Sequence, residues 1–179
     1  MDAAHLHLMI NHLPILGTPL VAGLLIWGMI RQSRDVLRAA LGAAIVVAAL
    51  SYPVFLTGEP AEEKVEDSAW LQERLVHEHE ERAEAGLIAI LLTGALGAVV
   101  LWQSRGGRGI PTATTGLTLA GLLISSGLFG WSALAGGLIR HDELRTDTSR
   151  LTIPAEGGAP VDSMVPATRE GRPDGDRDD

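Results

Sequence analysis

The chain has 179 residues, 46% of them hydrophobic and only 4% aromatic, and its formal net charge is −8. It contains no cysteine, which excludes thiolate metal ligands, covalent c-type haem attachment and disulfides. The acidic balance argues against nucleic acid as a partner. A mean hydropathy of +0.21 with long uncharged segments is typical of a membrane protein.

Four uncharged segments are long enough to cross a bilayer as helices: 8–30, 39–57, 85–104 and 109–139. Each approaches or exceeds the roughly 20 apolar residues that span the hydrocarbon core. We therefore predict an all-α integral membrane protein, a four-helix up-and-down bundle whose spans lie at about 12–30, 36–57, 84–103 and 115–139. These spans form one transmembrane domain, residues 1–145. The polar residues 146–179, rich in Pro, Gly and acidic side chains, are expected to form a disordered tail.

Arginines set the expected orientation. They follow the first and third spans, at Arg31, Arg34, Arg38, Arg105 and Arg108. The positive-inside bias places these loops in the cytoplasm, and hence both termini and residues 58–84 on the periplasmic side of a bacterial inner membrane. The N-terminus lacks a basic region and a cleavage site, so the first span is expected to stay in the protein.

All six histidines then fall on the outer side: His5, His7, His12, His77, His79 and His141. If Asn11 is the N-cap of the first span, Pro14 lies harmlessly in the first turn and His12 is exposed there. The residues before Asn11 would form an interfacial lead-in. Under this interpretation, His12 is the one of the first three histidines that lies on a helix, and His5 and His7 have accessory roles.

The third helix is expected to begin near Asp67 or Ser68, outside the bilayer. One face of this helix is predicted to be buried, because apolar and small residues, with one histidine among them, recur every three or four positions along it. These residues are Leu71, Leu75, His79, Ala83, Gly86, Ile90, Gly94 and Gly97. His79 would point inward, whereas His77 would lie on an acidic, solvated face.

The fourth helix is expected to begin near Thr115, after a loop. The same spacing predicts a second stripe of small residues that ends in an imidazole: Ser126, Gly130, Ala133, Gly137 and His141. Small residues along a span usually serve close helix packing, but they also leave room for a flat cofactor.

Imidazoles gathered at one membrane face predict a cofactor site. Haem b needs two axial imidazoles and cations near its propionates. The residues predicted to contact it are His12, His79, His141, His7, Arg82 and Arg140.

Carboxylates near the membrane offer a competing chemistry. Glu59 and Glu62 follow the second span directly, and histidine with carboxylate suits a non-haem ion such as Fe, Zn or Mn. The metal ligands would then be His12, His79, His141, Glu59 and Glu62.

Several short motifs resemble a group of uncharacterised bacterial four-helix inner-membrane proteins, a domain of unknown function whose arrangement is similar to small b-type cytochromes. The motifs are LHLMINHLPILG, LTGEPAEEKVE, the HE pair before the third span and GGLIRHDEL, and the resemblance covers about residues 6–144. The matching positions are His7, Asn11, His12, Pro14, Gly17, Gly58, Glu59, Pro60, Glu62, His79, Gly136, Gly137 and His141. The resemblance implies a site at the outer face without naming its cofactor.

The predicted function is a membrane redox or electron-transfer subunit. Its partners would be the lipid bilayer and other membrane redox subunits or a periplasmic electron carrier. The alternative is a non-catalytic accessory subunit of a respiratory or photosynthetic complex, with histidines that merely tolerate the interface. The sequence leaves open whether the protein is an enzyme.

Overall fold

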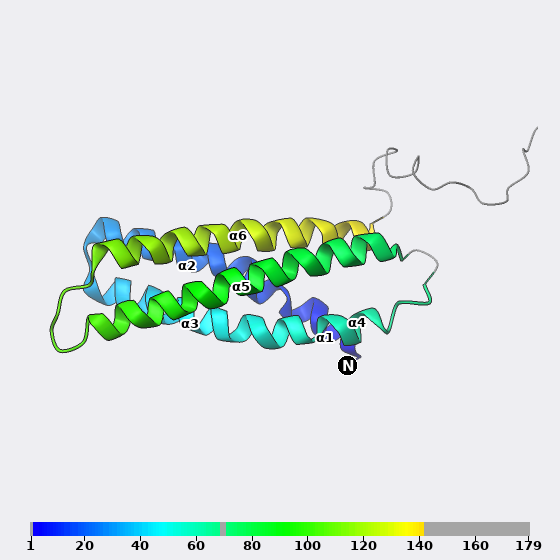
Figure 1. Ribbon diagram of the computed structural model, residues 1–179, viewed down its shortest axis with the longest axis horizontal. Coiled ribbons are helices and arrows are strands. Elements are labelled where there is room, and N and C mark those ends of the chain that lie inside the picture. Colours follow the sequence, from blue (N-terminus) through cyan, green and yellow to red (C-terminus); the bar gives the residue numbers. More distant parts are fainter. Residues whose placement is uncertain (1, 69–70, 142–179) are drawn as a thin grey trace, which may run out of the picture. The chain divides into compact units, whose positions relative to one another are not determined.

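The computed structural model describes residues 2–68 and 71–141, and every regular element in them is an α-helix. The four long helices are α2 (His12–Arg31), α3 (Arg34–Leu56), α5 (Glu73–Gln103) and α6 (Thr112–Arg140), and the two short ones are α1 (Ala3–Ile10) and α4 (Gly58–Glu62) (Figure 1). Four helical segments are long and apolar enough to cross a membrane, the first of them combining α1 with α2. This confirms the all-α class and the multi-pass pattern.

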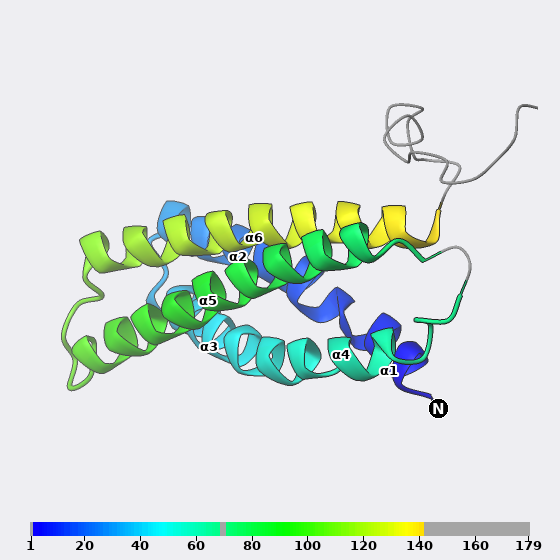
Figure 2. The ribbon, with the colours of Figure 1, turned by 45° about the vertical axis from the view of Figure 1, so that its right-hand side comes forward.

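The four long helices close into a ring. α2 contacts α3 and α6, and α5 contacts the same two helices from the other side (Figure 2). Successive long helices, α2, α3, α5 and α6, run in opposite directions, so the bundle is up-and-down. The chain divides into the units Met1–Arg145 and Thr146–Asp179, and the predicted disorder of residues 146–179 lies outside the described residues.

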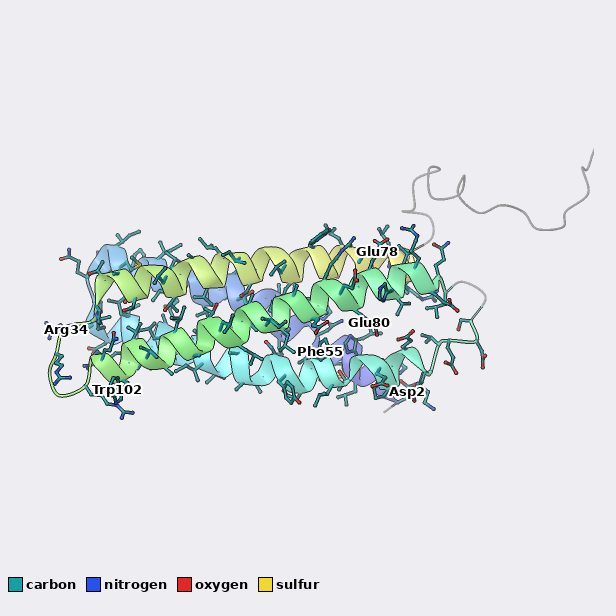
Figure 3. All side chains as sticks on the ribbon, viewed as in Figure 1. Asp2, Arg34, Phe55, Glu78, Glu80 and Trp102 are labelled. Carbon is teal, nitrogen blue, oxygen red and sulfur yellow. The ribbon has the colours of Figure 1, made fainter. Side chains whose placement is uncertain are left out.

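The two ends of the bundle differ in chemistry. The first, here the histidine end, contains α1, α4, the first turns of α5 and the last turns of α6, and α1 packs on α4 there. The opposite, arginine end contains the loops 32–33 and 104–111 (Figure 1). Figure 3 shows Glu78 and Glu80 at the histidine end and Arg34 and Trp102 at the arginine end.

Local side chains explain where the helices at the arginine end begin. Ser33 caps α3, since its hydroxyl accepts the Val36 N–H at 3.5 Å. α6 begins at Thr112 rather than near Thr115 as predicted. The Pro111 carbonyl accepts hydrogen bonds from the Thr115 N–H at 3.1 Å and from the Thr115 hydroxyl at 2.7 Å. These bonds close the first turn of α6 before the predicted start at Thr115.

The predicted start of the third helix near Asp67 or Ser68 is wrong, because α5 begins at Glu73. Residues 63–68 form successive turns, in which the Val65 N–H donates to Glu62 and the Ser68 N–H donates to Val65. A helix through this segment would place like charges four residues apart, which is destabilising.

The predicted inner face is confirmed from Leu75 onward, whereas Leu71 lies before the first residue of α5. Leu75, Gly86, Ile90, Gly94 and Gly97 are all buried. A Cβ atom added at Gly94 would lie 2.5 Å from the Ala48 Cβ of α3. Glycine is therefore required there by the close approach of two helices, as in other membrane bundles.

The predicted inner face of α6 is wrong. Its buried residues are Thr115, Thr118, Leu122, Ser125, Phe129, Ser132 and Ala135, a stripe shifted by one position, or about 100°, from the predicted one. Hydroxyls can be buried here because each finds a backbone carbonyl: Ser125 donates to Gly121 of its own helix at 2.8 Å, and Ser132 donates to His79 of α5 at 3.2 Å. The shift leaves His141 exposed at the end of α6.

Candidate functional site

His79 is half-buried on α5 and is held by α6. Its Nδ1 lies 2.9 Å from the carbonyl oxygen of Ser132. The Ser132 hydroxyl, 3.1 Å from Nδ1, donates to the His79 carbonyl at 3.2 Å. A carbonyl only accepts hydrogen bonds, so the neutral imidazole carries its proton on Nδ1 and keeps a lone pair on Nε2. A Cβ atom added at Gly136, one turn further along α6, would lie 3.2 Å from the His79 ring. Ser132 therefore orients this imidazole, and Gly136 leaves the space for it.

His7 is half-buried on α1 and is held by the end of α3. Its Nδ1 lies 2.8 Å from the Thr57 hydroxyl, which itself donates to the Val54 carbonyl at 2.6 Å. The only hydroxyl proton of Thr57 is thus engaged, so His7 must donate from Nδ1. Its Nε2 also keeps a lone pair.

His7 and His79 form a pair at the histidine end. They come from different helices, and they lie close enough to interact electrostatically. Metal-ligating histidines usually donate their second ring N–H to a fixed acceptor, which sets the tautomer and the ring orientation. Both imidazoles meet that requirement before any ligand is present.

His5 and His77 point away from the bundle. His5 Nδ1 lies 2.9 Å from Asp2 Oδ1, and His77 Nε2 lies 3.3 Å from Glu81 Oε1, both on exposed surface. Each therefore pairs with a carboxylate close to it in sequence rather than with another long helix. The predicted outward position of His77 and inward position of His79 are confirmed.

The other two predicted histidine ligands are exposed. His12 Nδ1 donates to the Leu8 carbonyl at 3.0 Å, and His141 follows the last residue of α6. The prediction that only His12 of the first three histidines lies on a helix is wrong, because Asp2 caps α1 through the His5 N–H and makes residues 3–10 helical. Within residues 2–68 and 71–141, no group of three or more His, Asp and Glu side chains could hold a metal ion.

Arg82, predicted to face a propionate, is already engaged. Its guanidinium donates to Glu78 at 2.9 Å and lies 4.4 Å from the ring centroid of Trp131. A propionate would have to compete with the Glu78 carboxylate. Arg140 is exposed as the last residue of α6.

The two predicted carboxylate ligands differ in surroundings. Glu59 is exposed, whereas Glu62 is half-buried at the end of α4. Burial raises the pKa of the Glu62 carboxyl above its ordinary value, and the charge of Glu80 and a hydrogen bond to it raise this pKa further. Glu62 is therefore directed toward another carboxyl group on α5.

Asn11 does not cap α2 as predicted. Its backbone is helical (φ −62°, ψ −21°), its N–H donates to the His7 carbonyl, and its side chain makes no capping hydrogen bond. A cap needs an extended backbone, which the preceding helix α1 prevents. The Asn11 Oδ1 atom is buried, and no described residue forms a hydrogen bond with it.

Sequence reasoning missed the residues that hold the imidazoles. Thr57 follows the last residue of α3 and Ser132 lies within α6, and only their three-dimensional contacts with the histidines mark them. The repeated spacing of HLH and HEH, with one half-buried imidazole in each, is the signal that could have identified His7 as a partner of His79.

Comparison with known proteins returns no matching family model, no matching curated protein and no matching solved structure. The resemblance to four-helix inner-membrane proteins therefore stays a prediction that rests on the short motifs alone.

Proposed function

We propose that the protein is a membrane redox subunit that binds a metal-containing cofactor through Nε2 of His7 and His79. The observation that carries this proposal is the matching state of the two imidazoles. Each is half-buried, each donates from Nδ1 to another helix or its end, and each keeps the Nε2 lone pair that a metal requires.

Aromatic side chains support a membrane boundary close to this pair. Trp27 and Trp102 lie toward the arginine end, and Tyr52 and Trp131 lie toward the histidine end, all at least 52% exposed. Along α6, Thr112 and Trp131 are about 28 Å apart at 1.5 Å per residue, close to the hydrocarbon thickness. Ser132, which holds His79, therefore lies at the interface, where Trp and Tyr concentrate.

Haem b and a non-haem ion both belong to the proposed cofactor class. His7 and His79 would hold haem b through their two Nε2 atoms, and bound haem would supply one-electron transfer. A non-haem ion takes three or more ligands and therefore needs a further donor. In either case this chain supplies imidazoles in a fixed tautomer at the membrane surface.

The competing function is an accessory subunit with interfacial histidines. The exposed side chains of His5, His12 and His77 support it. It provides no reason for two half-buried imidazoles to be fixed by a threonine hydroxyl and a serine carbonyl.

An optical spectrum of the purified full-length protein, dithionite-reduced minus oxidised, together with its metal content, tests the proposal. We expect either a b-type band or one stoichiometric transition metal ion. A colourless protein without metal, which also fails to take up hemin or divalent ions, would contradict it and favour the accessory subunit.

We further propose that the histidine end faces the periplasm of a bacterial inner membrane, since five arginines lie at the other end. The absence of native cysteine allows single-cysteine labelling. In intact cells, an impermeant maleimide should label Glu66→Cys and not Arg108→Cys. The reverse pattern would invert the orientation.

A further inference from the structure

Asn11 extends the inner face of α2 toward His7. His7, Asn11, Pro14 and Thr18 follow one another at spacings of three and four residues, which places them on one face of the helical path. Pro14 and Thr18 are buried, and His7 is half-buried. The Asn11 amide therefore belongs to the interior face, one turn from His7.

The amide oxygen of Asn11 has no hydrogen-bond partner among residues 2–68 and 71–141. Asn11 Oδ1 is buried, and the Asn11 side chain makes no capping hydrogen bond to α2. Buried polar atoms are nearly always paired because leaving one unpaired is destabilising. An orphaned acceptor on an interior face therefore indicates a missing partner, namely a hydrogen-bond donor or a cation.

Three electron-pair donors thus lie at the histidine end: Nε2 of His7, Nε2 of His79 and Oδ1 of Asn11. The two imidazoles have fixed tautomers, and the amide oxygen has no partner within the described part of the chain. A haem iron takes the two imidazoles and leaves the amide oxygen unpaired. A divalent ion of borderline hardness accepts two imidazoles with one oxygen ligand, whereas Mg²⁺ and Ca²⁺ prefer oxygen ligands throughout.

We infer that the site binds a redox-active divalent ion of borderline hardness, such as Fe²⁺, through His7, His79 and Asn11, with water in the remaining positions. This inference rests on the proposed function and selects the non-haem member of its cofactor class. It assigns Asn11 as a metal ligand and gives its buried oxygen the partner that none of the described residues provides.

Titration of the metal-stripped full-length protein in detergent with Co²⁺, followed by visible absorption, tests the inference. Wild type should bind one equivalent, with competition by Zn²⁺. Asn11→Ala should bind at least about tenfold more weakly, whereas Asn11→Asp, which keeps an oxygen at the same position and adds charge, should bind at least as tightly as wild type. His77→Ala is the matched control and should be unchanged.

The outcomes separate the inference from the proposed function. Wild type that binds hemin and no Co²⁺ would overturn the inference and leave the proposed function standing. Wild type that binds neither would overturn both. Equal Co²⁺ affinity of wild type, Asn11→Ala and Asn11→Asp would reduce Asn11 to a structural or water-binding role. If Asn11→Ala does not fold, Asn11→Asp decides, because weaker binding by that variant contradicts ligation.

Discussion

The HLH sequence of α1 and the HEH sequence of α5 each combine one exposed histidine with one half-buried histidine. In each, the first histidine is exposed and pairs with a nearby carboxylate, Asp2 or Glu81. In each, the second histidine is half-buried and donates from Nδ1 to another part of the bundle, Thr57 or Ser132. Two residues along a helix rotate the side chain by about 200°, so neighbouring imidazoles face opposite surroundings.

The comparison teaches that the number of histidines at a membrane face does not define a site. What distinguishes His7 and His79 is a fixed acceptor for one ring nitrogen, which leaves the other available. The two exposed histidines provide built-in controls on the same helices.

Removing the inward imidazoles should have the largest effect. His7→Ala and His79→Ala are each expected to abolish binding of the metal or haem, because each loses one Nε2 ligand. His5→Ala and His77→Ala should retain it at the wild-type level. Cofactor stoichiometry after purification measures the difference, and loss of binding in His77→Ala with retention in His79→Ala would reverse the comparison.

Filling the space beside His79 should weaken binding about tenfold without removing a ligand. Gly136→Leu puts a side chain where the His79 ring lies, since even a Cβ there is 3.2 Å from the ring. Gly137→Leu is the matched control, because a Cβ at Gly137 meets no described residue within 4 Å. The measurement is the affinity of each variant for Co²⁺ and for hemin. Equal affinities of the two variants would show that Gly136 does not position His79.

Thr57→Val should cost about 1 kcal/mol of unfolding free energy by removing the acceptor of His7. Thr57→Ser keeps the hydroxyl and should restore both stability and ligand affinity. Chemical denaturation in detergent and cofactor titration supply the two readouts. A serine variant that is as impaired as the valine variant would mean that the methyl group, and not the hydroxyl, matters.

The smallest effect is expected at Glu62. The pKa of the Glu62 carboxyl is raised in the folded protein. The protonated carboxyl therefore contributes fully to folding stability below the ordinary glutamate pKa, and this contribution is lost as the pH rises through the raised pKa. Glu62→Gln should therefore stabilise the protein slightly at neutral pH and flatten the pH dependence of its melting temperature. Glu66→Gln, on exposed surface, is the control, and a destabilised Glu62→Gln would contradict the assignment.

The fold was largely predictable because long apolar segments fix membrane helices by length alone. The inner face of α5 was also predictable, since glycine and leucine repeat along it. The face of α6 was not, because serine and threonine are polar in sequence but can be buried once they donate to their own helix.

The candidate site was predicted only in part. His79 followed from helical periodicity, whereas His7 was treated as accessory because Asn11 was expected to begin a new helix. That cap does not form, and α1 turns His7 toward Thr57 instead. Such long-range contacts have no local pattern in the sequence.

Nitrogen-15 NMR of histidine-labelled full-length protein in detergent tests the central claim most directly. Two imidazoles, assigned by their disappearance in His7→Ala and His79→Ala, should show the Nδ1-protonated tautomer at neutral pH, and addition of Zn²⁺ or hemin should shift their Nε2 resonances. The resonances of His5 and His77 should stay in place. Ligand-induced shifts confined to His5 and His77, or rapid tautomer averaging at His7 and His79, would contradict the account.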